Sequence, residues 1–167
     1  MSSFHRDTWV EVDLDCIYEN VQSIQGHVTE DVKVIAVVKA NAYGHGDAQV
    51  ANVALEAGAK YLAVSFLDEA MSLRQQGITA PILVLGASRV SDLPLAAKEN
   101  ITLTVFQKEW VEEAASAYQG TKSVKLHLKL DTGMGRIGAR TQEEVAQILE
   151  RIDKAANLQI EGIYTHF

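Results

Sequence analysis

The sequence has little that would favour a secreted, metal-binding or membrane-spanning protein. Its 167 residues include one cysteine, Cys16, so neither an intrachain disulfide nor a zinc cluster built from thiolates can form, and a reducing compartment is expected. The first residues lack the apolar core of a signal peptide, and no apolar run reaches the roughly 18 residues of a membrane-spanning helix. No metal-ligand spacing occurs either. We therefore expect a cytoplasmic protein without a metal site.

Positive charge is also in short supply. Lysine and arginine total 15 against 22 aspartate and glutamate residues, which gives a formal net charge of -7 without a long run of either sign. This balance favours solubility and argues weakly against nucleic acid or an anionic membrane as a partner. With 47% hydrophobic and 22% charged residues, the chain can bury a core of ordinary domain size. One domain, or part of one, is expected.

Strand-like and helix-like segments alternate along the chain, with no linker, sequence repeat or low-complexity stretch between them. Apolar and β-branched runs of strand length lie at residues 8–12, 32–38, 61–65, 82–85, 101–105, 124–130 and 158–164. Helical stripes lie in the segment that Asp13 can cap and at residues 50–57, 110–118 and 145–152. Gly58 and Gly77 fall where helix C-terminal caps are expected. The pattern predicts about six βα units in series.

Such a series fits either an open, doubly wound sheet or a (β/α)8 TIM-type barrel. The strand at residues 124–130 alternates strictly, with Lys125, His127 and Lys129 on one face and apolar residues on the other. A polar face toward a barrel lumen explains this alternation, although an ordinary edge strand would show it too. A complete barrel needs eight units and typically ~250 residues. We therefore expect residues 1–167 to form an incomplete, N-terminal part of a longer fold.

Lys39 is the strongest candidate for chemistry. It follows the apolar run at residues 34–38, so apolar walls at the lip of a buried parallel strand can remove water from its ammonium group and lower its pKa. A neutral amine can form a Schiff base. The turn that follows contains Tyr43 and the Gly-His-Gly run at residues 44–46, whose backbone amides can approach an anion such as a phosphate. The alternative is a lysine that extends into solvent beside glycines that serve only the turn.

A second group of candidates surrounds the end of the strand at residues 124–130. Arg136 can present a planar fork of donors to a carboxylate or a phenolate, and Lys129 should face the same side as His127. The alternative is structural, with Asp131 pairing with Arg136 to tie the loop. The two glycines of this loop are a weak signal by themselves.

Other candidates are weaker. His166 should share a face with Gly162 and Tyr164 by the period of two, but an isolated histidine is more often a structural donor than a catalyst. Asp68 and Glu69 should occupy the first turn of a helix, where carboxylates suit the helix dipole. On these grounds neither His166 nor the pair Asp68 and Glu69 is assigned a function.

At these residues the sequence resembles the alanine racemase family. The segment Val37-Val-Lys-Ala-Asn-Ala-Tyr-Gly-His-Gly46 is similar to that family's pyridoxal 5'-phosphate signature. The likeness continues in register through residues 63–70, 81–86, 129–136 and 161–167. It implies an isomerase that interconverts L-alanine and D-alanine through a pyridoxal-phosphate aldimine, supplying D-alanine for bacterial peptidoglycan. It also implies the N-terminal portion of a pyridoxal-phosphate-binding barrel, with the last barrel units and a C-terminal β domain absent from this chain.

The resemblance implies a role for each matching residue. Lys39 would form the Schiff base with the cofactor and then serve as acid/base on one face of the substrate α-carbon. Tyr43 would hydrogen-bond the cofactor phosphate, and Leu85 would pack near the cofactor. Arg136 would donate to the phenolic oxygen of the cofactor and help to hold the substrate carboxylate. Lys129 matches a lysine that is carbamylated to N6-carboxylysine in many members, which would position Arg136.

His166 would lie near the pyridine ring, bonded to an arginine that contacts the ring nitrogen. That arginine has no counterpart in this chain, and neither does the second acid/base, a tyrosine from the partner subunit of a homodimer. We therefore expect this chain alone not to be an efficient racemase. Two alternatives keep the lysine, namely a pyridoxal-phosphate carrier or homeostasis barrel and an amino-acid decarboxylase relative. A third is an inactive fragment or interaction module.

Overall fold

The computed structural model describes residues 5 and 7–167, which form one helix followed by a series of strands and helices. The strands are β1 (Ile35–Val37), β2 (Tyr61–Val64), β3 (Ile82–Val84), β4 (Ile101–Val105), β5 (Val124–Lys129) and β6 (Leu158–Tyr164). The helices are α1 (Leu14–His27), α2 (Lys39–Tyr43), α3 (Asp47–Glu56), α4 (Leu67–Gln75), the 3-10 turn η1 (Val90–Asp92), α5 (Leu93–Lys98), α6 (Lys108–Ala117) and α7 (Gln142–Asp153). None of the helices in these residues has the length and apolar character to cross a lipid bilayer.

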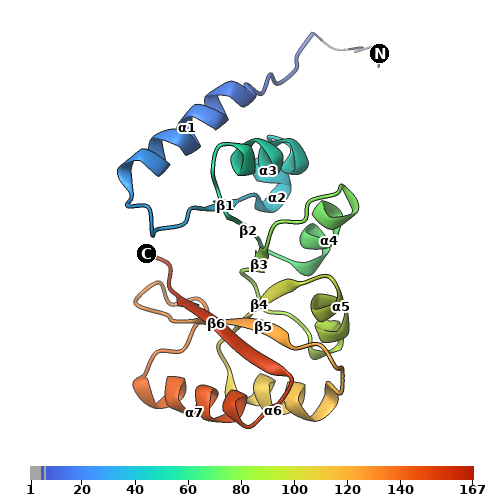
Figure 1. Ribbon diagram of the computed structural model, residues 1–167, viewed down its shortest axis with the longest axis vertical. Helices are drawn as coiled ribbons and strands as arrows, with labels where there is room; N and C mark the ends of the chain where they lie inside the picture. The colour runs from blue at the N-terminus through green and yellow to red at the C-terminus, as the bar shows by residue number, and fades with distance from the viewer. Residues whose placement is uncertain (1–4, 6) are drawn as a thin grey trace.

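The six strands form one sheet in which every strand is parallel to its neighbours in the sequence, in the order β1-β2-β3-β4-β5-β6. A doubly wound sheet reverses its strand order at a switch point, whereas a (β/α)8 barrel adds strands in sequence order. Figure 1 shows helices α3 to α7 along one side of the curved sheet, and the opposite side carries no helix of the described residues. The prediction of an incomplete barrel with six units is confirmed.

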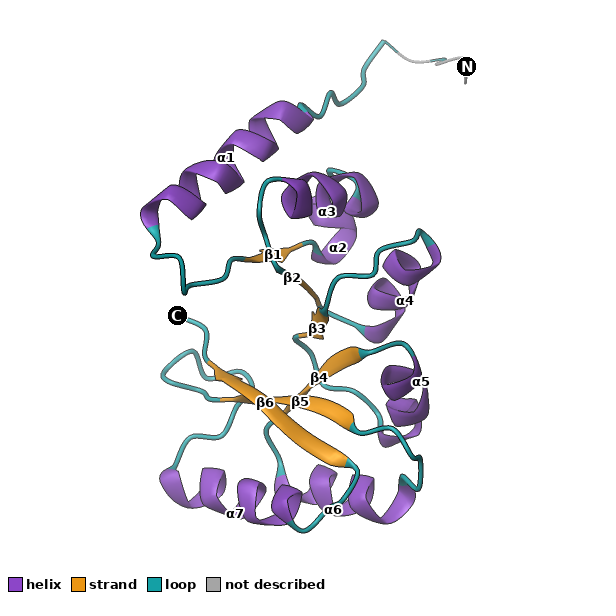
Figure 2. Cartoon of the chain, viewed as in Figure 1, coloured by secondary structure: helices purple, strands orange, loops and turns teal. Residues whose placement is uncertain are grey.

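The main core lies between the sheet and the helices, which Figure 2 shows as separate layers. Every residue of β3 and β4 is buried, as expected for central parallel strands. Two of these residues are polar and face the other side of the sheet. The hydroxyl of Thr102 lies 2.6 Å from that of Tyr61, and the hydroxyl of Thr104 donates to the carbonyl of Val84 (2.7 Å). The side of the sheet away from the helices therefore carries polar groups that find hydrogen-bond partners there.

Strand β5 has the two faces that its alternation predicts. Its apolar residues lie in the core with the helices, namely Val124, Leu126 and Leu128. On the other face, the ring of His127 lies between the rings of Tyr61 and Tyr164, with centroid distances of 6.1 and 6.3 Å, and Lys125 pairs with Glu161 (3.1 Å). Because β5 has a partner strand on each side, the edge-strand explanation of this alternation is wrong.

An irregularity in β6 adjusts its register to β5. Leu126 is paired with Ile160, but the next residue, His127, is paired with Gly162, so Glu161 is an extra residue in β6. A Cβ atom at position 162 would lie 2.9 Å from the His127 ring. The absence of a side chain on Gly162 therefore leaves room for the imidazole on the lumen side.

The strand predicted at residues 8–12 is wrong. The structure has no strand there, and Trp9 and Val10 are 61% and 84% exposed. A β-strand needs a neighbour that accepts and donates its backbone hydrogen bonds, and none of the described strands lies beside this segment. Strand β1 is also shorter than the predicted residues 32–38. It is an edge strand whose Ile35 and Val37 are each 41% exposed, so Lys39 follows a half-exposed strand and not a buried one.

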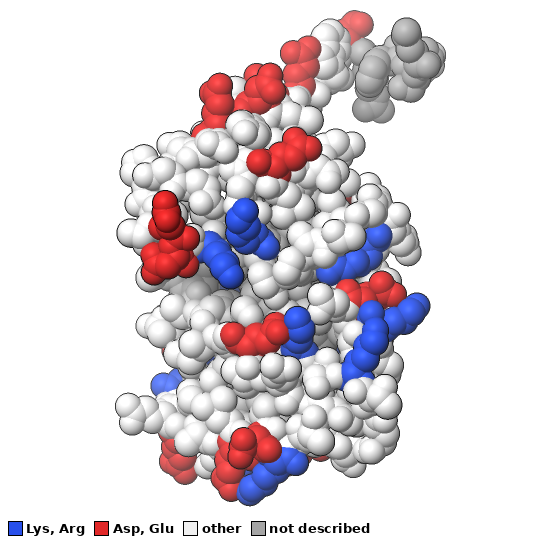
Figure 3. Space-filling view, viewed as in Figure 1, with Lys and Arg blue, Asp and Glu red and all other residues white. Residues whose placement is uncertain are grey.

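The predicted helix ends are confirmed. Asp13 caps α1, and its Oδ1 accepts hydrogen bonds from the backbone of Asp15 (3.0 Å) and Cys16 (3.1 Å). Gly58 and Gly77 follow α3 and α4 with φ of +117° and +87°, which suits a glycine after a helix. Figure 3 shows acidic side chains over α1 and charges of both signs interspersed over the rest of the same face.

We predict that replacing Gly86 with alanine destabilises the sheet. The Gly86 amide donates to the carbonyl of Ser65 (3.1 Å), and a Cβ atom at position 86 would lie 2.5 Å from that oxygen. Because the obstacle is backbone at the end of a central strand, Gly86→Ala should lower the free energy of unfolding by about 1–3 kcal/mol. Urea denaturation of the purified protein measures this change.

Gly26→Ala in α1 is the matched control, since a Cβ atom there meets nothing within 4 Å. Alanine should leave the stability unchanged or raise it by up to about 1 kcal/mol. If Gly86→Ala is as stable as Gly26→Ala, the close approach of the ends of β2 and β3 is not what requires the glycine.

Candidate active site

The candidate residues lie around one edge of the sheet, where the C-terminal ends of the parallel strands meet. Lys39 follows β1, Leu85 follows β3, and Lys129 is the last residue of β5. Arg136 lies in the loop between β5 and α7, and His166 lies just after β6. In barrels of this type the loops at that edge build the active site. The topology thus brings residues that are far apart in the sequence to the same end of the fold.

The short helix α2 after β1 is a left-handed turn. The φ angles of Ala40, Asn41, Ala42 and Tyr43 lie between +49° and +56°, and the first three have ψ between +45° and +51°. None of the four is glycine, and the left-handed conformation costs roughly 1–2 kcal/mol for each such residue. Strain of this kind persists only where the surroundings hold it, and it is concentrated at functional sites. The sequence pattern predicted an ordinary glycine turn here and missed the left-handed one.

The left-handed turn places Tyr43 beside Lys39. The Lys39 Nζ atom lies 5.8 Å from the centroid of the Tyr43 ring, and both side chains are accessible to solvent. The other side of the turn is anchored by Val38 and Ala42, which are buried. The amine and the phenol hydroxyl are therefore presented together at the rim of the sheet.

Lys129 is the one charged residue that is almost fully buried among the described residues, at 5% exposure. Burial lowers the pKa of its amine, and repulsion from the Arg136 guanidinium lowers that pKa further, while Asp131 opposes the shift. The Nζ atom lies 4.8 Å above the ring centroid of Tyr164. The amine is therefore more readily neutral than that of an exposed lysine.

Tyr164 connects this lysine to the end of β3. Its hydroxyl lies 2.8 Å from that of Thr104 and donates to the carbonyl of Leu85 (3.3 Å). Burial raises the pKa of Tyr164, so its hydroxyl stays protonated. The sequence pattern identifies Tyr164 only as a residue that shares a strand face with His166. The alternation along β6, which places Tyr164 opposite Lys129 of β5, is the signal that would have identified Tyr164 as part of the site.

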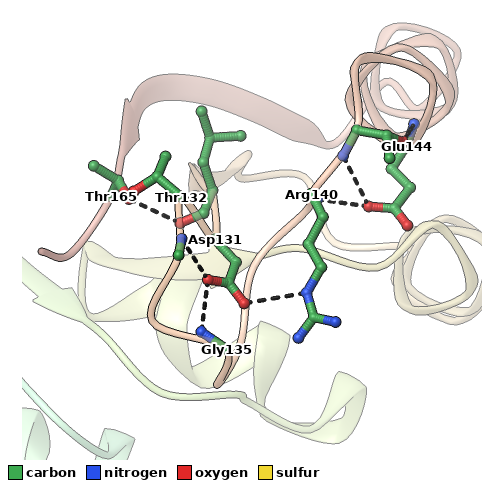
Figure 4. A network of polar contacts seen from close by, with 9 residues as sticks. Asp131, Thr132, Gly135, Arg140, Glu144 and Thr165 are labelled. Atoms are coloured by element: carbon green, nitrogen blue, oxygen red, sulfur yellow. Dashed lines mark hydrogen bonds and ion pairs between the residues drawn. The ribbon is translucent and has the colours of Figure 1, made fainter.

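The loop between β5 and α7 is organised around Asp131, as Figure 4 shows. One carboxylate oxygen accepts hydrogen bonds from the amides of Gly133 (3.2 Å) and Gly135 (2.9 Å), and the other accepts from Nε of Arg140 (3.1 Å). These bonds hold the pKa of Asp131 below its usual range, with the Gly135 amide contributing most. The alternative in which Asp131 pairs with Arg136 is wrong.

Arg140 is the partner because the loop returns to β5. The Ala139 amide donates to the carbonyl of Lys129 and the Asp131 amide donates to the carbonyl of Ala139, both at 2.9 Å, which brings Arg140 alongside Asp131. A Cβ atom at Gly138 would lie 2.4 Å from the Asp131 nitrogen, so this return requires glycine. Contacts between residues seven to ten positions apart decided the pairing.

Arg136 is left free to bind a ligand. Among the described residues, none forms an ion pair with Arg136 or accepts a hydrogen bond from its guanidinium. The side chain lines a cavity of about 540 Å³, which Lys108 and Arg140 also line together with Glu109 and Glu144. The five donors of an unpaired guanidinium fit a planar anion.

The structure brings some of the predicted residues together and leaves others apart. Lys39 contacts Tyr43, and Lys129 lies near Arg136 and Tyr164. His166 is exposed, and within the described part of the chain it forms no hydrogen bond or ion pair with these residues. The cofactor-binding roles implied for the individual residues stay predictions.

The chain is similar to known proteins over almost its whole length. A family model described as the N-terminal domain of alanine racemase matches residues 12–167. Curated alanine racemases from Geobacillus kaustophilus (strain HTA426) and Geobacillus stearothermophilus are 58% and 57% identical to this chain over 167 residues. Those alignments cover 100% of this chain and 44% and 43% of the two relatives. The chain thus spans less than half the length of these relatives.

Solved structures of racemases are also similar to this chain. An alanine racemase from Bacillus anthracis with bound L-Ala-P aligns with a TM-score of 0.94 and 55% identity, over 99% of this chain and 43% of that one. A histidine racemase from Leuconostoc mesenteroides subsp. sake aligns with a TM-score of 0.87 and 34% identity, over 92% of this chain and 41% of that one. Racemases named for two different amino acids therefore share this fold.

We predict that Asp131→Asn disorders the loop between β5 and α7. An asparagine side chain has one oxygen and so cannot accept from the glycine amides and from Arg140 at once. Hydrogen exchange at the amides of Gly133 and Gly135 should accelerate in the variant. Glu143→Gln in the exposed first turn of α7 removes the same charge and should leave both exchange rates unchanged.

The hydrogen bonds of Asp131 should lose their contribution to stability at acid pH. Because the pKa of Asp131 is lower in the folded chain than in the unfolded one, its contribution to stability is fully present above about pH 4 and is lost as the pH falls through the lowered value. Protection of the two glycine amides in the parent protein should therefore persist below pH 4. Loss of protection already above that pH would contradict the assignment.

Proposed function

The chain belongs to the alanine racemase family, and from that premise we propose that the full-length protein is an isomerase that interconverts L-alanine and D-alanine with pyridoxal 5'-phosphate. The chain is the N-terminal, lysine-bearing part of that enzyme. We propose with it a cytoplasmic role in supplying D-alanine for bacterial peptidoglycan. The observation that carries the proposal is the accessible Lys39 amine at the same edge of the sheet as the unpaired Arg136 guanidinium.

The donors at this edge fit the groups of the cofactor. Pyridoxal phosphate presents an aldehyde, a phosphate and a phenolic oxygen, and the site offers a primary amine on Lys39, a phenol hydroxyl on Tyr43 and a free fork of donors on Arg136. Two of these side chains are cationic, which suits an anionic ligand. When bound, the cofactor makes the α-proton of an amino acid acidic, because its conjugated ring accepts the carbanion charge.

The side chains of this chain would act around that group. We propose that Lys39 holds the cofactor aldehyde covalently and afterwards moves a proton at one face of the substrate α-carbon. Tyr43 would donate its hydroxyl to the phosphate, and Arg136 would donate to the phenolic oxygen and orient the substrate carboxylate. Leu85 would pack against the cofactor, and His166 would lie near its ring. The Leu85 carbonyl accepts a hydrogen bond from the Tyr164 hydroxyl, which supports the placement of Leu85, the residue after β3, at this edge.

Lys129 would support Arg136 through a change of charge. As an ammonium it repels the guanidinium, which is one reason why its pKa is lowered. The neutral amine can attack carbon dioxide: a nitrogen–carbon bond forms, one proton leaves, and an anionic carbamate results. The modified side chain would attract and orient Arg136. The burial of Lys129 and the proximity of Arg136 support this modification.

Racemisation needs a proton-transfer group on each face of the α-carbon. We assign one such group, Lys39, to this chain. The second would come from the partner subunit of a homodimer formed by the full-length protein. The substrate is a small amino acid, for which alanine is the choice that the two Geobacillus relatives support.

We predict that pyridoxal phosphate labels Lys39. The amine nitrogen bonds to the aldehyde carbon, the carbonyl oxygen leaves as water, and borohydride then delivers a hydride to that carbon and makes the product stable. Peptide mapping should find this adduct at position 39 in the parent and none there in Lys39→Arg. Lys60→Arg, which changes an exposed lysine before β2, should be labelled as the parent is.

A second sample with pyridoxal phosphate, left without borohydride, separates the competing functions. Exchange of the alanine α-hydrogen for solvent deuterium, dependent on Lys39, supports the racemase half-site. Labelling of Lys39 without any such exchange favours a carrier or homeostasis barrel. An absence of label at Lys39 contradicts the proposed function and favours an inactive fragment.

We predict a carbamate on Lys129 in bicarbonate. With 13C-labelled bicarbonate, the parent protein should show a carbamate carbon resonance that is missing from Lys129→Arg and disappears on acidification. Lys125→Arg is the matched control on the same strand face, where the lysine already pairs with Glu161. A free amine at Lys129 in the labelled sample would overturn the assignment.

A further inference from the structure

Residues 40–47 hold their conformation mainly through bonds within the segment. The Gly44 amide donates to the carbonyls of Ala40 (3.2 Å) and Asn41 (3.0 Å), and the Gly46 amide donates to Asn41 as well (3.0 Å). The side-chain oxygen of Asn41 accepts from the Asp47 amide (3.0 Å). These bonds close the turn on itself, and the Ala42 amide, which donates to the carbonyl of Val38 (3.0 Å), joins it to the end of β1.

One hydrogen bond from this segment reaches a distant part of the sequence. The Ala40 amide, directly after Lys39, donates to Oε1 of Glu69 at 2.6 Å, across 29 positions. Among the described residues, the other hydrogen bonds of residues 40–47 join positions no more than six apart. Glu69 is thus the polar group that ties the first left-handed residue to the neighbouring βα unit.

Glu69 is itself held rigidly by the start of α4. Its second oxygen, Oε2, accepts from the amides of Ser65 (2.7 Å) and Phe66 (3.0 Å), which lie between β2 and α4. The carboxylate also lies in the first turn of the helix, where the dipole favours a negative charge. Both oxygens are therefore in use, and both accept from backbone amides.

We infer that Glu69 is a positioning residue for Lys39: its carboxylate couples the end of β2 to the strained turn and so sets the direction in which the Lys39 amine is presented to the cofactor. This inference rests on the proposed function for its ligand. The position of the Glu69 carboxylate itself is given by its three hydrogen bonds from backbone amides. The need for a carboxylate follows from its two acceptor oxygens, since no neutral side chain accepts on both sides in this way.

Glu69→Gln separates the two halves of this arrangement. A glutamine can keep its carbonyl oxygen on the Ser65 and Phe66 amides, but its amide group then presents a donor to the Ala40 amide, which is also a donor. The cap of α4 is retained while the tie to Ala40 is lost. Glu69→Ala removes both, and Glu143→Gln, in the exposed first turn of α7, is the control for the loss of one such charge.

Two measurements test the inference. The first is the rate of pyridoxal-phosphate labelling at Lys39 after borohydride reduction, divided by the rate at the exposed Lys60 in the same sample. Because loss of a charge-assisted hydrogen bond should be worth a factor of roughly ten or more, Glu69→Gln should lower this ratio by at least roughly tenfold. The second is hydrogen exchange at the Ala40 amide, which should accelerate by a similar factor. Glu143→Gln should change neither.

The outcomes are distinct. A Glu69→Gln protein that keeps the parental labelling ratio or the parental protection of Ala40 overturns the inference. Failure of the parent to be labelled at Lys39 overturns the proposed function and the role of Glu69 toward the cofactor. In that case exchange at Ala40 still decides whether Glu69 holds the turn. A general loss of folding is recognised because it would change protection throughout the sheet, and Glu69→Ala provides that comparison.

Discussion

The parallel pairing of each strand with its neighbour in the sequence is the constraint on which the rest of this structure depends. It sends every connection back over the same side of the sheet, so the helices form one layer and the opposite side becomes a lumen. It also collects all the strand C-termini at one edge. Lys39, Leu85 and Lys129, which are spread over the chain, lie along that edge for this reason.

The lumen is stabilised by polar groups, and these reach the candidate site. Thr104 and the Leu85 carbonyl hold the hydroxyl of Tyr164, whose ring lies under the amine of Lys129. Buried polar groups of this kind are stable only when each finds a partner. The same side chains therefore determine the packing in the lumen and the position of the basic groups at its rim. A substitution of Thr104 would change the surroundings of Lys129, because Tyr164 contacts both residues.

Two acidic side chains shape the two loops that present the basic residues. Glu69 binds three backbone amides and supports the turn that bears Lys39. Asp131 binds two glycine amides and Arg140, and so organises the loop that bears Arg136. A carboxylate suits both places because it accepts on two sides and complements the positive amide dipoles. Lys39 and Arg136 remain available to bind a ligand, because the two carboxylates accept hydrogen bonds from backbone amides and Arg140 instead.

Local pattern determined much of this protein by itself: the six strands, the cap at Asp13 and the position of Lys39 after a strand follow from hydrophobic period and helix signals of a few residues. The resemblance in residues 37–46 supplied the family, which composition could not. Tertiary structure alone decided the left-handed turn of residues 40–43, the pairing of Asp131 with Arg140, and the lack of a strand at residues 8–12. The pairing and the missing strand depend on whether a partner is present, namely a loop that returns to its strand or a neighbouring strand. The left-handed turn directs the Ala40 amide to the Glu69 carboxylate, 29 positions away. Period and propensity describe single segments, whereas these features are set by what another segment offers.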